Sequence, residues 1–155
     1  MISPELLRRY PFFGQLNDEQ LRNLAMIAEQ ISLENDAVVL QEGQPAQALY
    51  FLLDGCVDLY YTVQEAFQQA DRKQIPVSQI NIGEPFGISA LIEPHILTST
   101  ARSSGTSRAI RFDAQGLKDL LARDPQLEAV LLRRMAQAAI ERLHATRVQL
   151  AAAWS

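Results

Sequence analysis

Apolar residues recur at helical spacing near the N-terminus. The positions concerned are Leu21, Leu24, Ala25, Ile27 and Ala28. Asn17 precedes them and Gln20 follows it by three residues, which is the spacing of a capping box. Before them, Ser3-Pro4 can open a short helix, and Pro11-Phe12-Phe13-Gly14 would end it. The pattern therefore predicts two N-terminal helices, with the two Phe side chains beneath the next element.

Short strands replace this pattern beyond residue 31. The predicted strands cover 37–40, 49–53, 57–63, 77–82, 98–103 and 108–112. Asp54-Gly55 is a strong hairpin signal, and Ser104-Gly105-Thr106 is predicted to separate the last two strands. Residues 64–76 are polar with both charge signs, so we expect a long hairpin loop with a helical turn as one option. Regularly spaced short strands of this kind predict a β-barrel or a sandwich.

Helix is predicted again at the C-terminus. Asp113 is a good N-cap for a helix to about Arg123, and Asp124-Pro125 has the residue types that start the next one. From there to Ala153 the sequence contains no Gly and no Pro. A helix of about 28 residues would be roughly 42 Å long, too long to lie wholly on a domain of this size.

One stripe of this last helix keeps strict 4-3 spacing over three heptads. Its members, called the predicted seam below, are Leu132, Ala136, Ala139, Leu143, Thr146, Leu150 and Ala153. Such a stripe either packs on the chain's own barrel or forms a dimer interface. We favour the dimer, because the helix is longer than packing within one chain requires.

Composition and charge exclude several classes of function. The 155 residues are 48% hydrophobic with a net charge of −4, which indicates a folded domain without the strongly basic surface of a nucleic-acid-binding protein. No secretory signal and no apolar run long enough for a membrane span are visible, and the single Cys56 excludes an intrachain disulfide. We therefore predict a cytoplasmic protein that does not bind membranes. We find no catalytic constellation and no metal-ligand spacing.

Four short motifs suggest a family when they occur in this order. They are Pro11-Phe12-Phe13, Glu42-Gly43, the run from Leu49 to Val57 that includes Gly55, and Gly83-Glu84-x-Phe86-Gly87 followed by Ala90-Leu91. Together they resemble the cyclic-nucleotide-binding domain family, the sensor module of catabolite-activator-type regulators and of cyclic-nucleotide-gated channels. The resemblance implies an α+β fold: an antiparallel β-barrel (jelly-roll, cupin-like double-stranded β-helix) flanked by N-terminal helices and a long C-terminal helix. Residues 1–124 would form the barrel domain, and residues 125–155 the C-terminal dimerisation helix.

The resemblance also implies a phosphate-binding cassette after Gly83. In the family a short helix begins at the Phe-Gly pair, a Glu follows for the ribose hydroxyl, and an Arg and a hydroxyl residue hold the cyclic phosphate. The corresponding positions here are Ile88, Ile96 and Leu97, and no Arg or Lys lies between Gly83 and Ala101. The predicted pocket residues are Gly83, Glu84, Phe86, Gly87, Ile88, Ser89, Ala90, Ile96, Leu97 and Thr98. His95 and Arg102 are candidate anion contacts, although a surface His and a solvated Arg are the simpler interpretations.

Losing these anchors predicts that neither cyclic AMP nor cyclic GMP binds in the family's usual way, and we expect no cofactor. The first hypothesis is a homodimeric regulatory sensor for a small-molecule effector. The second is a ligand-free module for dimerisation or for docking another protein; an enzyme is a distant third. The family's DNA-binding module would begin where this sequence ends at Ser155, so we expect a free-standing sensor or the N-terminal fragment of a transcription regulator. This chain alone would not contact nucleic acid.

Overall fold

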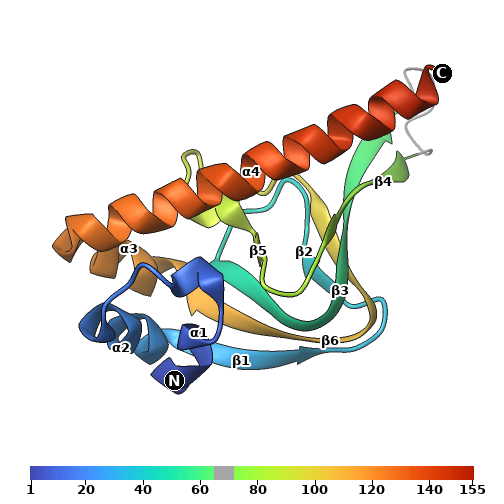
Figure 1. The fold of residues 1–155 in the computed structure, drawn as a ribbon. Coiled ribbons are helices and arrows are strands. Elements are labelled where there is room, and N and C mark those ends of the chain that lie inside the picture. The colour runs from blue at the N-terminus through green and yellow to red at the C-terminus, as the bar shows by residue number, and fades with distance from the viewer. Residues whose placement is uncertain (65–71) are drawn as a thin grey trace.

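The computed structural model describes residues 1–64 and 72–155. Its elements, in chain order, are α1 (Pro4–Arg8), the 3₁₀ helix η1 (Pro11–Phe13), α2 (Asp18–Met26), β1 (Ala28–Leu33), β2 (Val38–Leu40), β3 (Ala48–Gln64), β4 (Arg72–Ile80), β5 (Pro85–Phe86), the 3₁₀ helix η2 (Ile88–Ala90), β6 (Thr100–Asp113), α3 (Ala114–Arg123) and α4 (Pro125–Ala153). Figure 1 shows the helices of both termini outside a rolled sheet. Within the described residues, no helix is long and apolar enough to span a membrane.

The helix starts agree with the capping signals in the sequence. The Asn17 side chain accepts a hydrogen bond from the Gln20 backbone N–H at 2.8 Å, and the Gln20 side chain accepts one from the Asn17 N–H at 3.0 Å. Asp113 caps α3, and Asp124 caps α4 through the Leu127 N–H at 3.0 Å. Ser3 caps α1 through the Glu5 N–H. The predicted capping box and all four predicted helix starts are confirmed, because side-chain capping depends only on residues within one turn.

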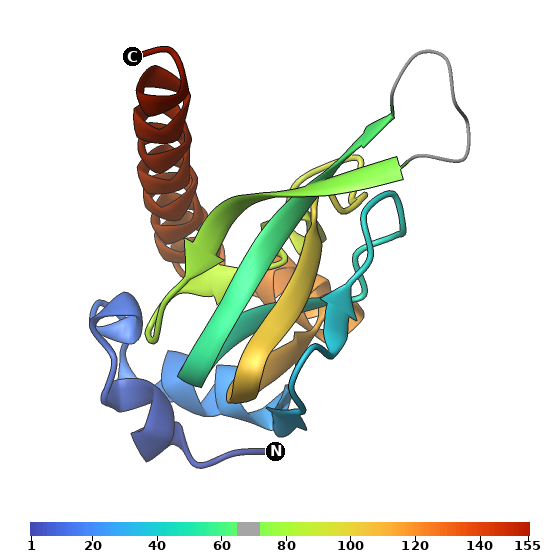
Figure 2. The ribbon, with the colours of Figure 1, turned by 90° about the vertical axis from the view of Figure 1, so that its right-hand side faces the viewer.

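All strands pair antiparallel in one six-stranded sheet. The order is β1-β6-β3-β4, with β2 added on β6 and β5 on β3. Figure 2 shows β4, β3 and β6 side by side in this order, moving away from α4. The predicted fold class is confirmed. Among the described residues no pairing joins β1 to β4, so the rolled sheet keeps two edges and is not a closed barrel.

Two predicted turns are wrong. β3 continues through Asp54-Gly55, and β6 continues through residues 104–106. Gly55 has a φ of 87°, and the β3–β6 register shifts on both sides of Asp54, which is the signature of a bulge. A bulge bends a strand while its neighbours stay paired, so each glycine curves the sheet and does not reverse the chain.

The predicted hairpin loop at 64–76 is shorter than expected, since β3 and β4 stay paired as far as Gln64 and Arg72. The optional helical turn within it lies outside the described residues.

The core has two parts. One lies between the helices and the sheet and contains Phe13, Phe51 and Phe112; the Phe13 and Phe51 ring centroids are 4.9 Å apart. Both Phe side chains were predicted to fill the core beneath the next element. Phe13 is buried in this core, whereas Phe12 is half-buried and packs against it. The second part fills the inside of the roll and includes Phe86 and Leu97.

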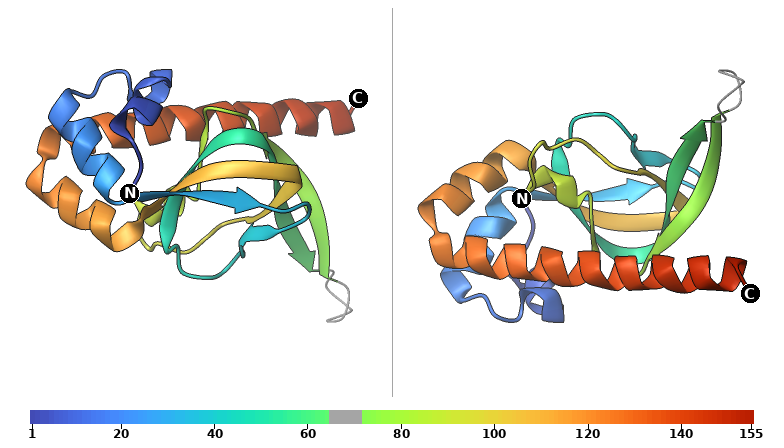
Figure 3. Two further views of the ribbon diagram at one scale, coloured as in Figure 1. Left: turned by 90° about the horizontal axis from the view of Figure 1, so that it is seen from below. Right: turned by 90° about the horizontal axis from the view of Figure 1, so that it is seen from above.

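Helix α4 belongs to the first part of the core over only half of its length. Leu127, Leu131, Met135 and Ala138 are buried, whereas every residue from Ala139 onward is exposed except the half-buried Arg142. Figure 3 shows α4 running along one side of the molecule from end to end. The second half of the helix therefore crosses the open side of the roll and does not enter the core.

Candidate ligand pocket

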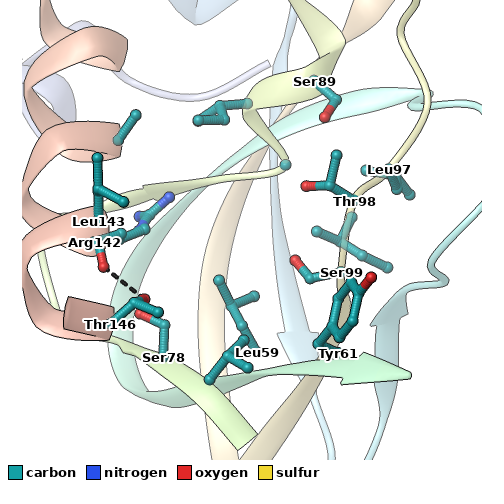
Figure 4. Close-up of a pocket in the computed structure, with 15 residues that line it drawn as sticks. Leu59, Tyr61, Ser78, Ser89, Leu97, Thr98, Ser99, Arg142, Leu143 and Thr146 are labelled. Carbon is teal, nitrogen blue, oxygen red and sulfur yellow. Dashed lines mark hydrogen bonds between the residues drawn. The ribbon is translucent and has the colours of Figure 1, made fainter. Parts of the chain in front are cut away.

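A cavity of about 540 Å³ lies between the rolled sheet, the segment after β5 and the second half of α4. Its lining comprises Leu40, Leu59, Tyr61, Val77, Ser78, Gly87, Ile88, Ser89, Leu97, Thr98, Ser99, Ala139, Arg142, Leu143 and Thr146. Figure 4 shows Arg142, Leu143 and Thr146 entering from α4 on one side, opposite Leu97, Thr98 and Tyr61. A molecule that fills this cavity would contact the sheet and α4 at the same time.

The segment after β5 forms one wall. Gly87 adopts a φ of 73°, and a Cβ at this position would lie 3.2 Å from the Ala48 carbonyl oxygen. Ile88 and Ser89 follow it into the lining. The short helix that the resemblance implied after Phe86-Gly87 is a single 3₁₀ turn over Ile88–Ala90. One such turn is too short to create the anion-attracting helix terminus that the resemblance implied.

The cassette residues divide between wall, core and neighbouring surface. Gly87, Ile88, Ser89, Leu97 and Thr98 line the cavity, while Phe86 and Ala90 are fully buried beneath it.

The remaining three lie elsewhere. Gly83 and Glu84 face a separate hollow against α4. Ile96 bridges to Pro45 with its side chain 39% exposed, and it lies outside the lining. Leu97, by contrast, is buried and lines the cavity together with Thr98 and Ser99.

Neither candidate anion contact reaches the cavity. His95 places its Nδ1 3.0 Å from the Ser89 carbonyl oxygen and faces a different hollow, beside Lys118 and Glu128. Arg102 lies outside the lining and stacks over the Tyr60 ring at 5.5 Å. Its neighbours Ala101 and Ser103 are buried, so strand alternation directs Arg102 away from the inside of the roll.

Sequence reasoning missed several residues of the pocket, and Arg142 is the one among them that carries a charge. The buried stripe Leu127-Leu131-Met135-Ala138 continues to this position at helical spacing. The Arg142 guanidinium donates through Nη2 to the Pro85 carbonyl oxygen. Burial lowers the pKa of Arg142, while the negative charges of Glu84 and Glu141 act in the opposite direction. The signal that could have identified Arg142 from the sequence is its position as a charged residue that extends an apolar stripe.

The predicted seam and the pocket share residues. Ala139, Leu143 and Thr146 line the cavity, and Leu143 is also 49% exposed. Ala136 and Leu150 are exposed outside the lining, and Leu132 faces the hollow beside His95. The face of α4 that was predicted for a partner helix therefore borders the pocket as well.

Comparison with known proteins agrees with this architecture. A family model described as cyclic nucleotide-binding domain matches residues 30–124. A solved structure from Geobacter metallireducens GS-15, described as a candidate cyclic nucleotide-binding protein, is 35% identical with a TM-score of 0.80 and covers 93% of this chain and 100% of its own. The sensor domain of the transcriptional regulator DNR from Pseudomonas aeruginosa is 24% identical with a TM-score of 0.66, and covers 87% of this chain and 91% of its own.

A longer protein matches with lower sequence identity than the Geobacter structure. The CRP-like cAMP-activated global transcriptional regulator of Mycobacterium tuberculosis is 24% identical over 133 residues, which are 86% of this chain and 57% of the regulator. The chain spans less than two thirds of the length of the curated relatives it matches.

Proposed function

We propose a function for this chain from one premise: it belongs to the cyclic nucleotide-binding domain family. In this proposal it is a cytoplasmic regulatory sensor that dimerises through α4 and binds a small molecule other than cyclic AMP or cyclic GMP. The observation that carries the proposal is the shared wall of the pocket. Because Ala139, Arg142, Leu143 and Thr146 of α4 line the cavity, a ligand would change the position or the mobility of that helix directly.

The alternative of a ligand-free module has less support. It required the aliphatic side chains at the cassette to fill the pocket. Ile88 and Leu97 do stand in its wall, yet a cavity of about 540 Å³ remains beside them. This volume lies within the usual range of small-molecule sites.

The missing anchors argue against the family's usual ligand. Ile88 offers no acceptor to a ribose hydroxyl. Ile96, the predicted Arg position, lies outside the lining, and the inward-facing Leu97, the predicted hydroxyl position, is aliphatic, so neither offers a charge to a cyclic phosphate. Each lost charge-assisted contact costs about 1.5–3 kcal/mol, so the loss of two would weaken binding by about 10²- to 10⁴-fold. A calorimetric titration of the purified protein with each nucleotide tests this. We expect no saturable heat below about millimolar concentration, and micromolar affinity would overturn the proposal.

Exposed apolar side chains on α4 support dimerisation. Ile140, Leu143, Val148, Leu150 and Trp154 are between 49% and 84% exposed on the second half of the helix. A monomer seldom leaves so many large apolar side chains close together on one element. Size-exclusion chromatography with light scattering should give the mass of a dimer at tens of micromolar protein; the mass of a monomer would contradict this part.

A further inference from the structure

Arg142 is the one charged side chain among the fifteen described residues that line the cavity. It forms no ion pair within 4.0 Å in the part of the chain that the structure describes. Its Nη2 donates to the Pro85 carbonyl oxygen, and within the same part its Nε is buried without any hydrogen-bond partner. The guanidinium is therefore desolvated and incompletely satisfied.

Such a group is costly for the fold alone. A buried cation with no carboxylate in contact loses hydration that one carbonyl oxygen does not replace, and Glu84 and Glu141 compensate only from beyond ion-pair distance. The stripe that leads to it consists of Leu127, Leu131, Met135 and Ala138, so an aliphatic residue at 142 would continue the packing without that cost. A desolvated charge that faces a cavity is a candidate for ligand recognition.

The rest of the cavity defines what the charge would meet. The aliphatic lining residues are Leu40, Leu59, Val77, Ile88, Leu97, Ala139 and Leu143. Six other lining residues carry hydroxyl groups, among them Thr146, whose hydroxyl donates to the Arg142 carbonyl oxygen at 2.8 Å, but most of the exposed wall surface is apolar. A single cation in a mainly apolar cavity suits a ligand with one negative charge and an apolar body.

We propose that Arg142 is the anion site of this pocket and that its ligand is an apolar molecule carrying one carboxylate. This assignment rests on the proposed ligand-sensing function and specifies the ligand class. The planar guanidinium can bind both oxygens of a carboxylate, and Nε is the donor still available for such a pair. The charge that the cassette lacks is supplied from α4, more than forty residues further along the chain.

The position of Arg142 gives binding a mechanical consequence. In the structure its Nη2 ties α4 to β5 through Pro85. A carboxylate in the cavity competes with that carbonyl for the guanidinium and is the stronger acceptor, because it carries charge. Ligand binding therefore exchanges an α4–β5 contact for an α4–ligand contact.

Calorimetry with matched probe pairs tests the assignment. We choose octanoate against 1-octanol and 1-naphthoate against 1-naphthalenemethanol, since each pair differs mainly in the carboxylate. The wild-type protein should bind at least one carboxylate about ten-fold to a hundred-fold more tightly than its alcohol. Arg142→Leu should abolish that preference, and Arg142→Lys should retain part of it, because the charge stays while the planar fork is lost.

Arg134 provides the matched control. It lies on the same helix, donates to a backbone carbonyl oxygen at Pro11, and also buries an Nε that has no partner among the described residues, but it lines a different hollow. Arg134→Leu should keep the preference for the carboxylate. Thermal melts establish that each variant is folded.

Two outcomes overturn the assignment: no carboxylate binds the wild-type protein more tightly than its alcohol, or Arg142→Leu keeps the preference. Failure of the proposed function would give different results: the mass of a monomer in light scattering, or micromolar binding of a cyclic nucleotide in calorimetry. Equal binding of carboxylate and alcohol would leave a ligand pocket without an anion site.

Discussion

At the scale of single residues, a glycine that resembles a turn signal in the sequence lies within a continuous strand. Gly55 follows Asp54 as in a hairpin turn, yet β3 continues through it and the register against β6 shifts there. A Cβ at Gly55 would lie 2.3 Å from the Ser107 Oγ and 2.7 Å from the Thr106 carbonyl oxygen. Close approach of β6 is therefore what requires glycine here, in addition to the positive φ.

A comparison of two alanine variants separates these two effects. Gly43 also has a positive φ, of 86°, but a Cβ there would meet nothing within 4 Å. Gly43→Ala should cost about 1–2 kcal/mol of unfolding free energy, the penalty of a left-handed conformation. Gly55→Ala should cost about 2–5 kcal/mol, because the clash with β6 adds to that penalty. Urea denaturation measures both; equal losses would contradict a steric role for β6.

Introducing the family's charged residues into the cassette tests which position faces the cavity. Leu97 lines the cavity and Ile96 does not. Ile88→Glu with Leu97→Arg should therefore increase the affinity for cyclic AMP by about ten-fold to a hundred-fold, as expected for a charge-assisted contact. Ile88→Glu with Ile96→Arg is the matched control and should have little effect. A larger gain from the Ile96 pair in calorimetry would show that residue 96 occupies the phosphate position.

At the scale of elements, the two halves of the continuous helix α4 have different surroundings. Its first half holds the core through Leu127, Leu131 and Met135, each at most 2% exposed. Its second half carries five of the seven residues of the predicted seam and one wall of the pocket. The change from buried to exposed residues lies near Ala138, and no Gly or Pro in the sequence marks it.

Two leucine variants should distinguish these halves. Leu131→Ala removes a buried side chain and should lower the unfolding free energy by about 2–5 kcal/mol. Leu150 is 59% exposed, so Leu150→Ala should change the stability of the monomer by less than about 0.5 kcal/mol while weakening the dimer. Urea denaturation in dilute solution and light scattering measure the two effects. An undiminished dimer in Leu150→Ala would place the interface elsewhere.

At the scale of the whole molecule, the sequence predicted local features better than distant ones. Asn17, Asp113 and Asp124 act within one turn, so their roles could be predicted from neighbouring residues. Whether Asp54-Gly55 reverses the chain or bends it depends on the pairing with β6, about fifty residues away. Arg142 was missed for the same reason, because only the packing of α4 across the roll brings it to the cassette.

Sharing of Leu143 between pocket and seam leads to a prediction for the whole molecule. If α4 pairs with a second copy and also closes over the ligand, the two equilibria must be linked, and each must shift the other by the same factor. The dimer dissociation constant, measured by sedimentation with and without saturating 1-naphthoate, should change by at least about five-fold, which is the lower end of typical couplings. Arg142→Leu serves as the control, since it should dimerise without responding to the carboxylate. Equal constants in the wild-type protein, with binding of the probe verified by calorimetry, would show that the ligand does not act through the dimer helix.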